Sequence, residues 1–81
     1  MNDSDVLVIE DESDIRELLV LHLQKAGFRV RAGNSGEDGL SMIRQEAPDL
    51  LLLDLMLPGI DGLEVCRRLK ANGATFPIIM V

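Results

Sequence analysis

The chain has 81 residues, of which 47% are hydrophobic and 27% charged, so it holds one domain at most. Its net charge of −6 at pH 7 argues against non-specific nucleic-acid binding by this segment and suits a bound cation. It has a single cysteine, an acidic start and no apolar run near the roughly 18 residues of a membrane span. We therefore expect a cytoplasmic protein with no disulfide, secretion signal or membrane segment.

Strand and helix signals alternate along the first half of the chain. The β-branched apolar run at 6–9 predicts a buried strand that ends in acidic residues. A helix is predicted over 14–27, with Ser13 as its N-cap and Gly27 as its end. Its apolar residues exceed one face, so we expect it to be covered on two sides. These residues are Ile15, Leu18, Leu19, Val20, Leu21 and Leu23. The alternating run at 28–32 predicts a short strand at a sheet edge.

The second half continues the alternation. Residues 34–47 predict a helix that begins with capping-box spacing. The run at 49–54 has no polar alternation, which predicts a strand with both faces covered. A third helix is predicted over 62–73, and a fourth strand begins within 76–81. The order β-α-β-α-β-α-β implies an α/β fold, with a parallel sheet and helices on both of its faces.

Acidic residues follow two of the predicted strands, at the edge where open parallel sheets bind ligands. The first strand ends at Glu10, Asp11 and Glu12, and the third ends at Asp54. If these strands are neighbours, the carboxylates converge, and two of them at about 4 Å repel by roughly 4 kcal/mol at an effective dielectric constant of about 20. A hard cation such as Mg²⁺ or Mn²⁺ would offset the repulsion. The residues alone leave Asp54 open as a metal ligand, a nucleophile toward phosphorus, or a cap of the next turn.

Three segments lie in order over nearly the whole chain: VLVIEDESDIRELL, PDLLLLDLMLPGIDGLEVCRRLK and PIIMV. In sequence and spacing they resemble the receiver domain of bacterial two-component response regulators, in particular the winged-helix transcription-factor branch. The resemblance implies a flavodoxin-like, doubly wound sheet with strand order 2-1-3-4 out of five strands. It also implies a phosphoacceptor, not a turnover enzyme, that serves a sensor histidine kinase. The phosphoryl signal would then pass to an output domain that we expect to bind DNA.

The same resemblance implies roles for individual residues. Asp54 matches the phosphoacceptor and, together with Asp11, a direct ligand of Mg²⁺ or Mn²⁺. Glu10 matches the acid that holds a metal-bound water. The backbone carbonyl of Met56 matches the family's main-chain metal ligand.

The sequence also departs from the family pattern. It stops at Val81, before the Ser or Thr and the Lys that contact the phosphoryl group in the family, so we expect a truncated receiver domain over 1–81. Truncation should bare apolar surface on the first and third strands and leave the fourth strand as an exposed edge. Such surfaces favour a homo-oligomer or strand exchange.

Other functions stay open beside the phosphoacceptor. Without the Lys and the Ser or Thr, the fragment could serve as a dimerisation or docking module that works without phosphorylation. A flavin or dinucleotide enzyme would need a glycine-rich loop after the first strand, where EDES stands. An aspartyl-phosphate phosphatase would want a second acid at position 56, which is Met56.

Overall fold

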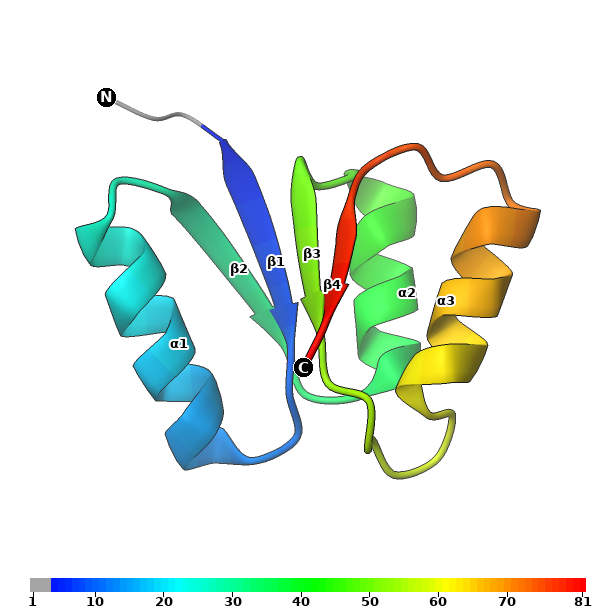
Figure 1. The fold of residues 1–81 in the computed structure, drawn as a ribbon, viewed down its shortest axis with the longest axis horizontal. Helices are drawn as coiled ribbons and strands as arrows, with labels where there is room; N and C mark the ends of the chain where they lie inside the picture. Colours follow the sequence, from blue (N-terminus) through cyan, green and yellow to red (C-terminus); the bar gives the residue numbers. More distant parts are fainter. Residues whose placement is uncertain (1–3) are drawn as a thin grey trace.

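Four parallel strands in the order β2-β1-β3-β4 form the centre of the computed structural model, which describes residues 4–81. The strands are β1 (Asp5–Ile9), β2 (Arg29–Gly33), β3 (Leu50–Leu53) and β4 (Ile78–Met80), and the helices are α1 (Ser13–Lys25), α2 (Gly36–Gln45) and α3 (Gly62–Ala71). Figure 1 shows α1 on one face of the sheet and α2 and α3 on the other. The predicted flavodoxin-like order 2-1-3-4 is therefore confirmed. The prediction of one domain over 1–81 includes residues 1–3, which lie outside the described residues.

The start of α1 differs from the sequence prediction. Ser13 is already the first helical residue, and Glu12 takes the N-cap position with an extended backbone. Glu12 makes no side-chain capping hydrogen bond. The turn before the helix is held instead by the Glu10 carboxylate, whose Oε2 accepts the N–H of Glu12 at 3.0 Å. The prediction of Ser13 as N-cap is thus wrong by one residue, because this local contact sets where the helix begins.

Side chains cap the other two helices at the positions that the sequence favours. Ser35 Oγ accepts the N–H of Asp38 at 3.0 Å at the start of α2. Asp61 Oδ1 accepts the N–H of Glu64 at 2.9 Å at the start of α3. Each bond satisfies one N–H that has no partner within its helix.

The main core fills the space between the sheet and the α2–α3 layer. Apolar side chains from β1 and β3 meet others from the two helices and from the loop before α3. The buried members are Leu7, Ile9, Leu40, Leu51, Leu53, Leu57, Val65 and Leu69. Burial of this aliphatic surface is the main favourable contribution to folding.

The face of the sheet that packs against α1 is less completely covered than the other face. Burial on this side differs from three of the predictions. Val6 and Val8 of β1 are at most 1% exposed, so the first strand is not bared. Leu50 and Leu52 of β3 are only half-buried, so the third strand is not covered on both faces. Within the described chain, α1 has no buried residue and is therefore not covered on two sides. The cause is that α1 connects β1 to β2 and packs over that half of the sheet.

The register of β1 and β3 is held at both ends. At one end, Asp5 N–H donates to Asp49 Oδ2 at 2.7 Å, and Asp49 N–H donates to the Asp5 carbonyl at 2.8 Å. At the other end, Asp54 N–H donates to the Ile9 carbonyl at 3.0 Å. The buried Asp5 carboxylate forms an ion pair with Arg31 at 2.6 Å. From residue 4 to residue 81, no helix combines the length and apolar character that a bilayer span requires.

Candidate functional site

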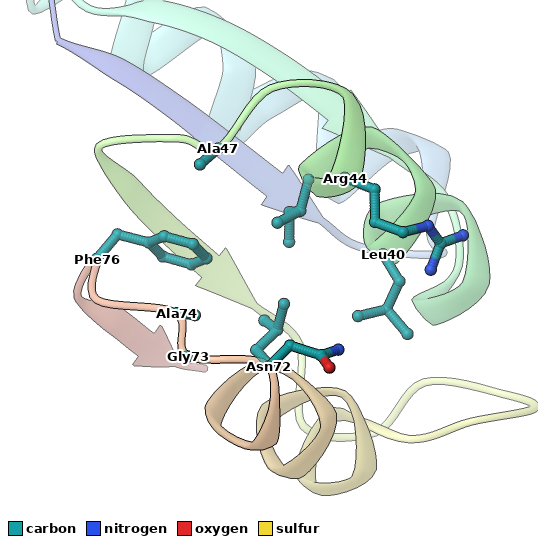
Figure 2. Close-up of a pocket in the computed structure, with 9 residues that line it drawn as sticks. Leu40, Arg44, Ala47, Asn72, Gly73, Ala74 and Phe76 are labelled. Carbon is teal, nitrogen blue, oxygen red and sulfur yellow. The ribbon is translucent and has the colours of Figure 1, made fainter.

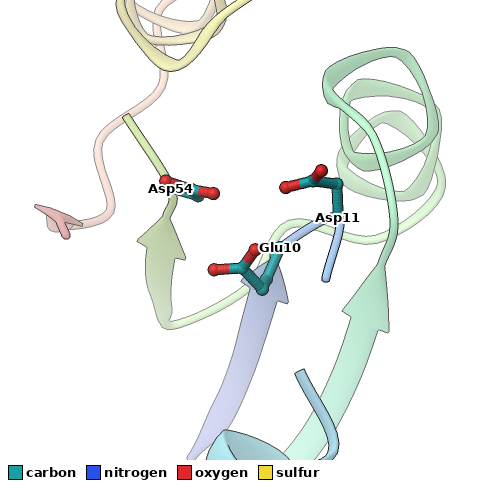
Figure 3. Close-up of side chains that lie close together, drawn as sticks. All are labelled: Glu10, Asp11 and Asp54. Atoms are coloured by element: carbon teal, nitrogen blue, oxygen red, sulfur yellow. The ribbon is translucent and has the colours of Figure 1, made fainter. Parts of the chain in front are cut away.

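Three carboxylates meet at the carboxyl edge of the sheet. The register pairs Ile9 with Leu53, so Glu10 and Asp54 are the next residues of adjacent strands. One carboxylate oxygen from each of Glu10, Asp11 and Asp54 lies within 4.8 Å of the other two. Figure 3 shows the three side chains around a common space. The predicted convergence is therefore confirmed for these residues, which we call the acidic cluster.

Glu10 is the most buried member of the acidic cluster, with 6% of its surface exposed. Burial raises the pKa of Glu10 above its usual value, and the charge of Asp54 raises the pKa further, whereas the hydrogen bond from Glu12 N–H opposes the rise. The charged form of Glu10 is thus less favourable in the folded protein than it is in water. A hard divalent cation with oxygen ligands would relieve this strain, so the donor set fits Mg²⁺ or Mn²⁺.

Asp54 is oriented by the backbone that follows it. Its Oδ1 accepts the N–H of Met56 at 3.0 Å, which closes a turn from side chain to main chain. Met56 itself is 80% exposed. No contact among the described residues places its carbonyl as a ligand, so the main-chain role of Met56 stays a prediction.

The first residue of α3 packs directly against the backbone of Asp54. A Cβ on Gly62 would lie 2.5 Å from the Asp54 carbonyl oxygen and 2.9 Å from the Cα of Leu55. The N–H of Gly62 also donates to the Leu55 carbonyl at 3.2 Å. Only glycine lets the helix begin this close to the end of β3, so Gly62 fixes the loop that carries Asp54.

Arg16 is a contributor to this region that sequence reasoning missed. Its guanidinium Nη1 donates to the main-chain carbonyls of Glu10 at 2.9 Å and Asp11 at 3.3 Å. No familiar motif has this spacing. The available signal is that a long helical side chain in the first turns points back toward the N-terminus.

A cavity lies away from the acidic cluster, between the ends of α2 and α3 (Figure 2). Its volume is about 240 Å³, and it is lined mainly by apolar side chains such as Leu40, Leu69 and Phe76. Its lining includes residues that precede β3 and β4, so it sits at the amino edge of the strands. None of its lining residues belongs to the acidic cluster.

Comparison with known families identifies one matching domain. The family model described as the response regulator receiver domain matches residues 6–81. The transcriptional regulatory protein AfsQ1 of Streptomyces coelicolor is 51% identical over 76 residues, which are 94% of this chain and 33% of that protein. PhoP of Bacillus subtilis, a transcriptional regulatory protein of alkaline phosphatase synthesis, is 42% identical over 94% of this chain and 32% of its own length. The chain thus spans about a third of these relatives.

Solved structures show the same arrangement. The N-terminal domain of a response regulator receiver protein from Methanoculleus marisnigri superposes with a TM-score of 0.91 at 35% identity, over 95% of this chain and 64% of that one. A Francisella response regulator receiver domain superposes with a TM-score of 0.93 at 23% identity, over 96% of this chain and 64% of that one. The latter identity supports the shared fold alone.

Proposed function

Since the chain belongs to the response regulator receiver domain family, we propose that Asp54 accepts a phosphoryl group from a histidine of a partner kinase. The observation that carries the proposal is the acidic cluster, in which Asp54 ends a central strand beside the carboxylates of Glu10 and Asp11. Such a cluster favours a divalent cation, which would offset negative charge as the phosphoryl group approaches the carboxylate. Asp54 is then a stoichiometric acceptor, not the site of a turnover enzyme.

A cation at this site would be held by oxygen atoms. We assign Asp11 and Asp54 as direct carboxylate ligands, the Met56 carbonyl as a main-chain ligand, and Glu10 as the holder of a bound water. The fit rests on the three oxygens within 4.8 Å and on the raised pKa of Glu10. When bound, Mg²⁺ would neutralise negative charge on the phosphoryl oxygens.

The transfer itself needs one nucleophile and one leaving group. A carboxylate oxygen of Asp54 attacks phosphorus, and the bond from phosphorus to the histidine nitrogen breaks with its electron pair staying on the imidazole. The product is an acyl phosphate on Asp54. The hydrogen bond from Met56 N–H holds the carboxylate in one orientation, which reduces the rearrangement needed before attack.

In the whole protein, we propose that the state of Asp54 is relayed to an output domain that regulates transcription. This follows from the names of AfsQ1 and PhoP, both transcriptional regulatory proteins that extend well beyond the matched region. The segment described here contributes the acceptor, and its charge of −6 leaves DNA contact to another part.

The test is chemical labelling with acetyl phosphate in the presence of Mg²⁺, read by intact mass spectrometry. The unmodified protein should gain one phosphoryl group, and Asp54→Asn should gain none. Asp14→Asn removes one exposed carboxylate from the nearby first turn of α1 and should leave labelling intact. Labelling of Asp54→Asn at the normal rate would refute Asp54 as acceptor. Failure of the unmodified protein to become labelled would favour the docking function that works without phosphorylation.

A further inference from the structure

We propose that Arg16 is a positioning residue of the acidic cluster. By holding the carbonyls of Glu10 and Asp11, it fixes the loop that presents both carboxylates toward Asp54. The inference rests on the proposed function, because it concerns how well this cluster binds a divalent cation. Among residues 4–81, the side-chain hydrogen bonds of Arg16 go to these two main-chain carbonyls and to none of the three carboxylates.

The loop from β1 to α1 consists of residues 10–12 and is held by two sets of hydrogen bonds. Within the loop, Glu10 Oε2 accepts the N–H of Glu12 at 3.0 Å. From α1, Arg16 Nη1 donates to the Glu10 carbonyl at 2.9 Å and to the Asp11 carbonyl at 3.3 Å. The Glu12 side chain does not cap the helix, so Arg16 adds a constraint that the N-cap does not supply.

The acceptors of the Arg16 hydrogen bonds determine whether this residue neutralises the negative charge of the acidic cluster. The ion pairs found in residues 4–81 involve Arg31, Arg67 and Arg68, and Arg16 takes part in none of them. Its hydrogen bonds go to the main-chain carbonyls of Glu10 and Asp11 and not to their carboxylates. The guanidinium therefore braces the loop without neutralising the oxygens that a cation would use.

A positioning role and a simple charge effect predict opposite results. A nearby positive charge repels a cation, so its removal alone should strengthen Mg²⁺ binding. Loss of a loop brace should weaken binding, as is usual for groups that orient metal ligands. The sign of the change in affinity thus separates the two roles.

The experiment measures Mg²⁺ affinity by calorimetry, since the chain has no tryptophan to report binding. Arg16→Met should raise the dissociation constant about tenfold, the lower end for groups outside the ligand shell. Arg16→Lys, which keeps the charge and a shorter donor, should restore part of the affinity. Arg29→Met removes the same charge from an exposed residue at the other edge of the sheet and should leave affinity unchanged.

Hydrogen exchange in metal-free protein supplies a second measurement. The amide of Glu12 should exchange faster in Arg16→Met and not in Arg29→Met. If circular dichroism shows that Arg16→Met does not fold, the Mg²⁺ affinity of Arg16→Lys tests the positioning role instead. That affinity should lie below the affinity of the unmodified protein.

The outcomes separate this inference from the proposed function. Mg²⁺ binding that is unchanged or stronger in Arg16→Met overturns the positioning role while leaving the proposed function in place. Absence of Mg²⁺ binding by the unmodified protein overturns the proposed function, and the inference with it.

Discussion

Replacing Gly62 with alanine should damage the acidic cluster from a position that carries no charge. Gly62 begins α3 against the backbone at the end of β3, where the added Cβ would meet the Asp54 carbonyl oxygen at 2.5 Å and the Leu55 Cα at 2.9 Å. Both neighbours are main-chain atoms, so no side-chain rotation can make room. Either the start of α3 or the loop after Asp54 must move.

The size of the effect follows from these distances. The contact to the carbonyl oxygen is 0.9 Å shorter than the 3.4 Å at which ordinary contact begins. Overpacking of this kind lowers the free energy of unfolding by about 1–3 kcal/mol. Because the displaced backbone carries Asp54, Mg²⁺ affinity should also fall by about tenfold, as for other changes that misplace metal ligands.

Gly73→Ala provides the matched control at the other end of α3. Gly73 has a positive φ of 81° and no atom within 4 Å of the added Cβ, so alanine there strains only the backbone. That strain is about 1–2 kcal/mol, similar to the effect expected for Gly62→Ala. Urea denaturation followed by circular dichroism measures stability, and calorimetry measures Mg²⁺ affinity. Equal losses of affinity in both variants, or full stability of Gly62→Ala, would refute the reasoning.

Two further variants probe opposite edges of the sheet. In buffer with a chelator, Glu10→Gln should be more stable than the unmodified protein at pH 7, because the raised pKa of Glu10 means that its charged form destabilises the folded state. This difference in the free energy of unfolding should shrink as the pH falls through the raised pKa of Glu10 toward the usual 4.5. Urea denaturation at several pH values measures the difference. A difference that grows on acidification would contradict the raised pKa. Arg31→Met leaves the buried Asp5 carboxylate without its cation and should lower the free energy of unfolding by about 1–3 kcal/mol with Mg²⁺ affinity unchanged. Urea denaturation and calorimetry test both parts, with Arg29→Met on the same strand as control, and full stability of Arg31→Met would show that the pair contributes nothing.

The order of strands and helices along the chain followed from sequence because it depends on local patterns, namely apolar runs and helical periodicity. That β1 and β3 are neighbours, which brings the acids of the cluster together at one edge, did not follow from these patterns; it was implied by the resemblance to receiver domains and is confirmed by the strand order. The orientation of each side chain at that edge could not be predicted from such patterns. Arg16 reaches back along its own helix to two carbonyls, which depends on side-chain conformation and not on spacing.

Coverage of apolar surfaces was the other feature that sequence did not settle. Residue type shows that an apolar surface favours burial, but it does not show which helix or strand packs against that surface. Val6 and Val8 are fully buried whereas Leu50 and Leu52 on the adjacent strand are not, although all four are similarly apolar. The prediction that the edge strand β4, where Ile79 is exposed, favours a homo-oligomer or strand exchange remains untested.

The four consecutive leucines of β3 carry little information about their own alignment with β1, because a shift by one residue replaces three of the four with another leucine. A shift would nonetheless turn Asp54 toward the opposite face of the sheet and away from Glu10. The alignment is specified outside the run, by Asp49, whose backbone and side chain both bond to the backbone of Asp5, and by Asp54, whose N–H bonds to Ile9. The two aspartates at the ends of β3 therefore fix its alignment with β1. Asp54, the proposed phosphoacceptor, thus also helps to set the alignment that places its own carboxylate beside Glu10.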